Sequence, residues 1–305
     1  MKVHFGFPDQ PQGPVAATVG SFDGVHVAHQ HLIRRLGETA ARADVQALVV
    51  TFEPHPRCIL DPANCPQSIT TLAEKLDLLG GLGVDQTVVL EFTRELSQVS
   101  AEDFMARLRA AYELRVLLAG YDFALGRARQ GNTTWLAEHG RSHGYAVEVV
   151  PPFRQEGREL HSSDVRGLLT TGDVRGASKL LGREYAISGL VEPGDRVGRT
   201  LGYPTVNIAV EANKLIPRRG VYAGRVRTPA GVYGGALSVG YRPTFEGTQL
   251  RVEAYLLDFS GDLYQQRLQV AFVERLRDEV RYPTKQALVE QMARDVEETR
   301  RVLAA

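Results

Sequence analysis

The pattern of apolar segments changes once along this chain, near residue 150, and the change limits the folds available to it. Before that point, short apolar runs alternate with segments of helical spacing, which predicts an open parallel sheet covered by helices on both faces. After it, two short helices precede strand-like segments that Gly and Pro separate without helical crossovers, which predicts an antiparallel barrel or sandwich. A length of 305 residues also favours two domains.

Each expected element can be given by its residue range. In the first half we expect strands at 15–20, 45–52, 86–91, 115–120 and 145–150, and helices at 30–42, 71–82, 101–112 and 132–143. In the second half we expect helices at 162–169 and 173–181, strands at 185–191, 206–210, 220–227, 232–239, 252–258 and 269–273, and a terminal helix at 284–303. We place the boundary near Arg183, giving domains 1–182 and 183–305.

Composition and charge narrow the class of partner. The formal net charge is zero, so the chain has no global basic field for nucleic acid, and small-molecule substrates are favoured. No run of 18 or more apolar residues occurs, and the first residues lack the apolar core of a signal peptide. We therefore expect a cytoplasmic protein without a nucleic-acid, membrane or obligate protein partner.

The two cysteines, Cys58 and Cys65, lie in one Pro-rich stretch. They could form a disulfide or remain two thiols. Because no secretion signal is found, we expect reduced thiols.

The segment from Thr18 to His31 reads as a strand, a tight turn and the start of a helix. A helix N-terminus offers unpaired N–H groups and the positive end of the helix dipole, which together bind phosphate. His26 and His29 lie on one helix face, so they can address the same anion. The pattern favours nucleotide chemistry. Histidines at a helix start also serve as caps, and His26, His29 and His55 could instead ligate a metal, although no suitably spaced Cys or acidic partner completes that site.

Four segments of the first half occur in order after successive expected strands: GSFDGVHVAH at 20–29, TFEPHP at 51–56, GYDFALG at 120–126 and SSDVR at 162–166. Together they resemble the FMN adenylyltransferase module of bacterial bifunctional riboflavin kinase/FAD synthetases. The resemblance implies a Rossmann-like nucleotidyltransferase domain that transfers AMP from ATP to FMN, giving FAD and pyrophosphate, with Mg²⁺ required.

The same resemblance assigns roles to individual residues. Because the FMN phosphate is already ionised near neutral pH, no general base is needed, and the site must position two anions and stabilise charge. The residues carried over are His26, His29 and Arg166 for the ATP phosphates and catalysis, Gly20, Phe22, Asp23, Ser162 and Ser163 for phosphate binding, and Asp122, Phe123 and Arg129 for the nucleotide and flavin end of the cleft.

Three residues depart from the family pattern. Ala28 adds a methyl group where Gly is usual, Leu125 replaces a second aromatic residue, and His161 takes the first position of a Ser-Ser-Thr-x-x-Arg run. None of them removes a charged group, so we expect FAD formation to survive. The alternative is a monofunctional riboflavin kinase whose first domain is impaired at these positions.

In the second half, the run 194–202 is basic and Gly-rich, as a flap over a polyphosphate would be, and Gly198 and Gly202 are candidate phosphate-binding positions. Thr205 and Asn207 are two residues apart on an expected strand, so their side chains point to the same face. A hydroxyl and an amide oxygen are hard, neutral ligands suited to Mg²⁺ that also binds water and nucleotide phosphates. The chain contains no Walker A sequence, so a kinase here must cradle phosphate differently.

The stretch 202–207 resembles the riboflavin kinase signature Gly-x-Pro-Thr-x-Asn, and further matches follow as far as residue 279. This resemblance implies an antiparallel β-barrel that phosphorylates riboflavin to FMN, with Glu253 as the base that accepts the proton of the 5′-hydroxyl. Alternation places Arg251, Glu253 and Tyr255 on one strand face, which also suits an ordinary solvent-facing glutamate. Arg277 is a candidate flavin-site residue or a surface ion-pair partner. A flavin- or nucleotide-binding regulator without turnover is the remaining class.

Overall fold

The computed structural model describes residues 1–155, 157–193, 198, 201–244 and 247–304. Packing divides the chain into two compact units, Met1–His161 and Ser162–Ala305. The division falls earlier than expected because two helices, α7 (Ser162–Thr171) and α8 (Val174–Leu181), pack on each other and α8 packs on strands of the second unit. The compact units therefore divide at residue 161, and the domains 1–182 and 183–305 expected from the sequence stay a prediction.

Among the described residues, the first unit is built on a six-stranded sheet with the order β1-β4-β3-β2-β5-β8. Its pairings are parallel, as expected from the alternation of strands and helices. The edge strand β1 was not expected. The strands are β1 (Lys2–Phe5), β2 (Gln12–Val19), β3 (Gln46–Glu53), β4 (Gln86–Glu91), β5 (Tyr112–Gly120) and β8 (Ala146–Val150).

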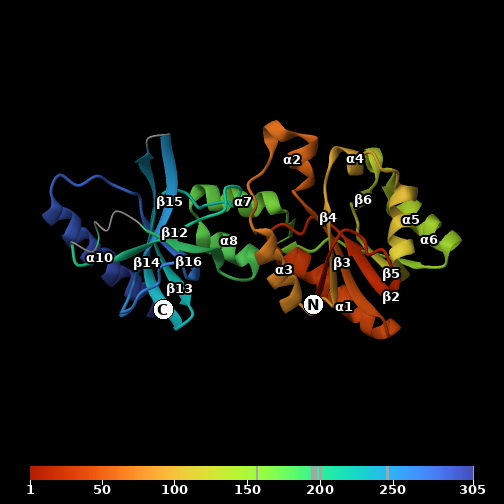
Figure 1. Ribbon diagram of the computed structural model, residues 1–305, viewed down its shortest axis with the longest axis horizontal. Coiled ribbons are helices and arrows are strands. Elements are labelled where there is room, and N and C mark those ends of the chain that lie inside the picture. Colours follow the sequence, from red (N-terminus) through yellow and green to blue (C-terminus); the bar gives the residue numbers. More distant parts are fainter. Residues whose placement is uncertain (156, 194–197, 199–200, 245–246, 305) are drawn as a thin grey trace. The chain divides into compact units, whose positions relative to one another are not determined.

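Helices cover both faces of this sheet (Figure 1). On one face, α1 (Val27–Ala43) and α3 (Leu72–Gly81) bury apolar side chains that include Leu36 and Leu79. On the other, α5 (Ala101–Ala111) and α6 (Thr133–His143) bury a cluster that includes Leu108 and Leu136. The shorter elements are α2 (Pro56–Leu60), η1 (Pro62–Asn64), α4 (Arg94–Ser97), β6 (Ala124–Leu125), η2 (Arg127–Arg129), β7 (Gly131–Asn132), β9 (Arg154–Gln155) and β10 (Arg158–Glu159).

The strand order reverses at β2, which lies between β3 and β5. From β2 the chain adds β3 and then β4 on one side, and β5 and then β8 on the other. Ligands of such sheets bind in the crevice outside the carboxyl ends of the strands at this switch point. The segments that follow β2, β3 and β5 therefore converge there, as the sequence predicted.

The second unit contains a closed antiparallel barrel with the order β11-β12-β15-β14-β13-β16, which resolves the choice between barrel and sandwich. In β15, Val252 and Ala254 are buried, whereas Glu253 lies on the opposite strand face. The strands are β11 (Tyr185–Glu192), β12 (Thr205–Ile208), β13 (Gly220–Thr228), β14 (Gly231–Thr244), β15 (Gly247–Leu256) and β16 (Arg267–Arg277).

The last helix, α10 (Lys285–Ala304), packs on the barrel strands β13, β14 and β16. Its position agrees with the expected terminal helix. None of the helices in the described residues, α10 included, combines the length and apolar character that crossing a bilayer requires.

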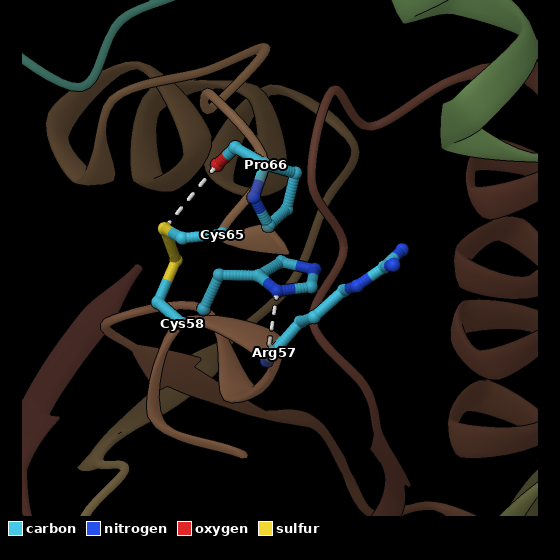
Figure 2. The surroundings of a disulfide bond; sticks show 5 residues. Arg57, Cys58, Cys65 and Pro66 are labelled. Atoms are coloured by element: carbon cyan, nitrogen blue, oxygen red, sulfur yellow. Dashed lines mark hydrogen bonds between the residues drawn. A yellow bond between two sulfur atoms is a disulfide. The ribbon is translucent and has the colours of Figure 1, made fainter. Parts of the chain in front are cut away.

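Cys58 and Cys65 form a disulfide, so the expectation of reduced thiols is wrong (Figure 2). The chain turns back through α2 and η1, which brings the two Cα atoms to 4.2 Å of each other. The sequence argument considered only the cellular compartment and could not see this proximity. His55 begins the segment as the N-cap of α2, because its Nδ1 accepts a hydrogen bond from the backbone N of Arg57 at 3.2 Å.

Candidate active sites

The first candidate site begins where β2 ends and the chain turns sharply. Phe22 and Val25 adopt left-handed backbone conformations, with φ of 48° and 40°, and Gly24 has a φ of 82°. The buried ring of Phe22 meets the His29 ring edge-on, with centroids 5.3 Å apart. A Cβ on Gly20 would lie 3.0 Å from the Phe22 ring, so glycine lets this turn close. The turn thereby brings the start of α1 to the carboxyl edge of the sheet.

His26 and His29 lie together at the start of α1. Their rings stack with centroids 3.6 Å apart, and Nδ1 of His26 caps the helix by accepting a hydrogen bond from the backbone N of His29 at 3.4 Å. Nδ1 of His29 is buried and has no hydrogen-bond partner among the described residues. Burial, with the nearby His26 and Lys75, holds the pKa of His29 well below its usual value. A neutral imidazole with one available nitrogen therefore stands at the positive end of the helix dipole.

Asp23, three residues before His26, is buried, and its carboxylate accepts hydrogen bonds from backbone N–H groups. Its Oδ1 accepts hydrogen bonds from the backbone N of Ile69 at 3.0 Å and of Thr70 at 3.1 Å. The Thr70 hydroxyl in turn accepts a hydrogen bond from the backbone N of Gly24 at 3.1 Å. These bonds join the turn after β2 to the segment before α3. They give Asp23 a positioning role within the phosphate-binding set expected from the sequence.

Lys75 is a candidate site residue that the sequence analysis missed. It lies on α3, is 4% exposed, and its Nζ lies 3.3 Å from the backbone O of Phe52 and 3.8 Å from Oε2 of Glu53. Burial lowers the pKa of Lys75, against the opposing effect of Glu53 and Asp23. The available sequence signal was its position four residues before Leu79, on the apolar face of the helix. A buried cation at the end of β3 adds positive potential to this edge of the sheet.

The loop after β5 carries Asp122, Phe123 and Arg129. Nη2 of Arg129 donates a hydrogen bond to the backbone O of Asp122 at 2.7 Å, and the backbone N of Phe123 donates one to the O of Gly120 at 3.0 Å. Phe123 packs against the apolar cluster beneath α5, whereas Asp122 and Arg129 are exposed. The loop is thus closed by its own contacts, and the charged side chains of Asp122 and Arg129 remain accessible at the carboxyl edge of the sheet.

Thr205, Asn207 and Glu253 form the centre of the second candidate site. Thr205 and Asn207 lie two residues apart on β12, as expected, and the pairing of β12 with β15 sets Asn207 opposite Glu253. Oγ1 of Thr205 donates a hydrogen bond to Oε2 of Glu253 at 3.1 Å. Oδ1 of Asn207 is buried and has no hydrogen-bond partner within the part of the chain that the structure describes. Three groups that carry oxygen ligands therefore converge on adjacent strands.

This set of groups fits Mg²⁺. A hydroxyl, an amide oxygen and a carboxylate are the hard ligands that the ion prefers, and a buried acceptor without a donor is satisfied by a cation. Thr205 and Asn207 are the residues that would hold the ion, and Glu253 lies beside them.

Most of the expected phosphate flap, residues 194–197 and 199–200, lies outside the described residues. Gly198 is described, and a Cβ there would lie 2.3 Å from the backbone O of Tyr203 and 3.4 Å from Oγ1 of Thr205. Glycine is therefore required for this segment to pass so close to the backbone of Tyr203. Gly202 has a φ of 87°, which also favours glycine.

Thr205 lines two cavities in this unit. One, of about 240 Å³, lies against α10 and includes Glu253, Leu288 and Met292 in its lining. The other, of about 540 Å³, is lined by residues that include Phe259. Because Thr205 belongs to both walls, groups bound in the two cavities would meet beside this residue, and Glu253 lines the smaller cavity next to it.

Arg277 lines the smaller cavity but is engaged by α10. Its Nε and Nη2 donate hydrogen bonds to the two carboxylate oxygens of Asp295, at 2.8 and 2.6 Å. Asp295 is 7% exposed, and its hydrogen bond raises the pKa of Arg277. The ion pair expected as an alternative is present, and it fastens the helix to the barrel. A flavin contact by Arg277 stays a prediction.

Comparison with known proteins agrees with this division of chemistry. Family models match the chain as FAD synthetase over residues 9–164 and as riboflavin kinase over residues 181–303. The chain is 36% identical over 290 residues to the bifunctional riboflavin kinase/FMN adenylyltransferase of Pseudomonas fluorescens, with 94% of this chain and 93% of that protein covered. Proteins of the same name from Listeria monocytogenes (94% and 91% covered) and Escherichia coli K12 (93% and 91%) are each 33% identical.

The chain belongs to the bifunctional riboflavin kinase/FMN adenylyltransferase family. The crystal structure of a macrolide-efflux protein from Streptococcus pneumoniae is 29% identical, with a TM-score of 0.89 and with 98% of this chain and 99% of that chain covered. The word efflux belongs to the name of the pneumococcal protein only. The family of this chain is assigned from the family models and the bifunctional relatives given above.

The last part of the adenylyltransferase pattern lies on α7. Ser162, Ser163 and Arg166 occupy its first turns, in the second compact unit, whereas His26 and His29 belong to the first. The FAD synthetase match ends at residue 164, within this helix. Joint action of Arg166 with the two histidines therefore stays a prediction.

Proposed function

We propose that this family member phosphorylates riboflavin to FMN with ATP in its barrel, and transfers AMP from a second ATP to FMN in its parallel-sheet unit, releasing pyrophosphate. The observation that carries the proposal is the convergence of Thr205, Asn207 and Glu253 on paired strands, where Thr205 lines both cavities and Glu253 lines the smaller one. We further propose that both reactions use Mg²⁺ and small-molecule substrates only, and that they take place in the cytoplasm.

In the kinase reaction, Glu253 accepts the proton of the riboflavin 5′-hydroxyl as that oxygen attacks the γ-phosphate in line. The hydroxyl of Thr205 orients the carboxylate through the bond of 3.1 Å. Asn207 and Thr205 hold Mg²⁺, which supplies neutralisation of the phosphate charge.

In the adenylyl transfer, the FMN phosphate is already an anion and needs no base. The rate acceleration therefore comes from positioning the two substrates and from stabilising the charge of the transition state. The N-terminus of α1, with His26 and His29, binds the ATP phosphates, and Lys75 contributes positive potential from beneath. Arg166 completes the set in this proposal. Exposed Asp122 and Arg129 face the flavin and nucleotide end.

The alternative of an impaired first domain rests on Ala28, Leu125 and His161. Leu125 is 8% exposed and belongs to the apolar core beneath α5, so the lost aromatic ring is replaced by a packed side chain. Ala28 lies in the first turn of α1 and is half-buried. These placements favour a working first domain over a monofunctional kinase.

The test is to incubate the purified full chain with riboflavin, ATP and Mg²⁺ and to separate the flavins by chromatography over time. FMN that appears first and then converts to FAD supports both reactions. FMN that accumulates without FAD, even when FMN is the starting flavin, supports the monofunctional kinase. Absence of any conversion overturns the enzyme proposal in favour of a flavin-binding regulator.

The proposed Mg²⁺ ligands have their own test. Thr205→Val removes the hydroxyl, whereas Thr205→Ser keeps it as a matched control. We expect the valine variant to need roughly tenfold more Mg²⁺ for half-maximal FMN formation, because a ligand is lost. Equal Mg²⁺ dependence of the two variants would exclude Thr205 as a ligand.

A further inference from the structure

A cluster of three side chains joins α5 to α6, away from the residues proposed for catalysis. His139 and His143 lie one helical turn apart on α6, and Glu102 lies in the first turn of α5. Nε2 of His139 is 3.2 Å and Nε2 of His143 is 4.0 Å from the same Oε1 of Glu102. The potential ligand atoms all lie within 4.8 Å of one another.

The outer nitrogens of both rings are engaged elsewhere. Nδ1 of His143 lies 2.9 Å from the backbone O of His139, and because a carbonyl only accepts, Nδ1 carries the proton there. Nδ1 of His139 bonds the hydroxyl of Tyr145 at 2.7 Å. These contacts direct Nε2 of each ring toward Glu102. Such outer contacts fix the orientation of histidines that bind metals.

Because Nδ1 of His143 carries its proton, the lone pair on Nε2 of that ring faces the carboxylate of Glu102, an arrangement that a cation between them would stabilise. The side chain of His139 beside it is 3% exposed. Two neutral imidazoles and one carboxylate are the ligands that Zn²⁺ prefers, with a fourth tetrahedral position left for water.

We propose that Glu102, His139 and His143 bind a single Zn²⁺ ion that clamps α5 to α6. The site is separate from the proposed Mg²⁺ site at Thr205 and Asn207, and its ligands differ in kind, because Mg²⁺ favours oxygen ligands whereas imidazole favours zinc-like metals. The clamp consists of one ligand from α5 and two from α6, so it needs both helices in place.

The clamp joins the two helices that border the loop proposed to face the flavin. The middle of the loop lies against the start of α5, because a Cβ on Gly126 would lie 2.5 Å from the backbone N of Ala101. The backbone N of Arg127 donates a hydrogen bond to the O of Val99 at 2.8 Å. After the loop, the chain passes through β7 directly into α6. Zinc would thus tie together the two helices on which this loop rests.

The only tryptophan of the chain reports on the site. Trp135 stacks on His139, with ring centroids 4.7 Å apart. The full chain, free of nucleotides and chelators, is titrated with Zn²⁺ by calorimetry and with paramagnetic Co²⁺ by tryptophan fluorescence. We expect one ion per chain, binding in roughly the micromolar range or tighter, and quenching by Co²⁺ that Zn²⁺ reverses.

The test variants are His143→Ala and Glu102→Gln, whose side chains are 32% and 58% exposed and can change without opening the core. Each should weaken Zn²⁺ binding by about tenfold or more and abolish Co²⁺ quenching. His4→Ala, which removes a histidine from β1, is the matched control and should bind as the unaltered chain does. Circular dichroism checks the fold of each variant, and Glu102→Gln decides if His143→Ala does not fold.

Two results would overturn the proposal. One is an unaltered chain that binds no Zn²⁺ up to roughly 100 μM, a concentration well above that of functional sites. The other is full Zn²⁺ affinity in both variants, which would move the ion to another pair, such as the stacked His26 and His29. Loss of binding in the two variants but not in His4→Ala supports it.

Discussion

The two candidate sites of this chain are built in different ways. In the parallel-sheet unit, the side chains stand on turns, loops and helix starts near the ends of β2, β3 and β5, and the turn after β2 is held by contacts with the segment before α3. In the barrel, Thr205, Asn207 and Glu253 stand on two strands that hydrogen-bond to each other. The geometry of the first site depends on loops, whereas the geometry of the second site is set by the register of two paired strands.

This difference follows from the two reactions. A nucleophile that is already ionised needs oriented N–H groups and cations, which helix ends and loops supply. A hydroxyl nucleophile needs a base at a fixed distance from a bound cation, and strand register holds such a distance well. Four experiments test how far the contrast holds, from the largest expected effect to the smallest.

The strongest separation is expected from Glu253→Gln. Formation of FMN from riboflavin should fall by about 10²–10⁴-fold because an amide cannot accept the hydroxyl proton. Conversion of supplied FMN to FAD should be unchanged, since that reaction needs no base. Rates are measured by flavin chromatography, with exposed Glu297→Gln on α10 as the control of equal charge change. Loss of both activities together would contradict the assignment.

The reciprocal change is His29→Ala. We expect the FMN-to-FAD rate to fall by about 10²–10³-fold, because a preorganised contact to the phosphates is removed. FMN formation should be unaffected. His31→Ala, two residues further along α1 and exposed, is the control. An undiminished FAD rate would mean that the helix N-terminus alone binds the phosphates.

A site built from loops should also depend on links between loops. Replacing both Cys58 and Cys65 by Ser opens the short ring that contains η1, and should lower the free energy of unfolding of the first unit by about 2 kcal/mol. Urea denaturation followed by the fluorescence of Trp135 measures this, because the only tryptophan lies in that unit. Kinase activity should be retained. An unchanged unfolding midpoint would show that the disulfide does not stabilise the native unit.

The smallest effect is a difference in pH dependence. All eight histidines lie at or before His161, so the barrel has none. The pKa of His29 is well below its usual value in the folded chain, so below about pH 6.5 the unfolded chain binds more protons. The first unit should therefore lose stability as pH falls, by at most about 1.4 kcal/mol per pH unit from this residue.

The measurement is the urea midpoint of Trp135 fluorescence between pH 7 and 5.5. His29→Gln should flatten the slope relative to the unaltered chain, and His31→Ala should not. His139, whose pKa is also lowered, contributes a slope of the same sign that remains in both variants. Equal slopes in the unaltered chain and His29→Gln would contradict a neutral buried His29.

Much of the fold could be predicted from the sequence. The range 86–91 matches β4 residue for residue, because a buried strand in a parallel sheet is a continuous apolar run with clear ends. The edge strand Lys2–Phe5 was missed since only one neighbour pairs with it and its side chains are partly exposed. The unit on which α7 and α8 pack could not be predicted, because the sequence of an amphipathic helix does not show which surface its apolar face covers.

Site residues were predictable where their spacing along the sequence determines which face of a strand or helix they share. Thr205 and Asn207 share a strand face by alternation, but the partner strand and the bond to Glu253 depend on long-range register. Lys75 looks like any helical lysine until packing buries it. The disulfide depends on a chain reversal through two short elements that propensity does not reveal.

The packing of α7 has a consequence for dividing this gene into two. A cut after His161 would separate the two compact units. Ser162, Ser163 and Arg166 would then belong to the same polypeptide as the barrel. The kinase half would keep its covering helices and should work alone. The other half would keep its sheet and both site histidines but lose Arg166, so an unchanged adenylylation rate in that half alone would exclude this arginine from the proposed set.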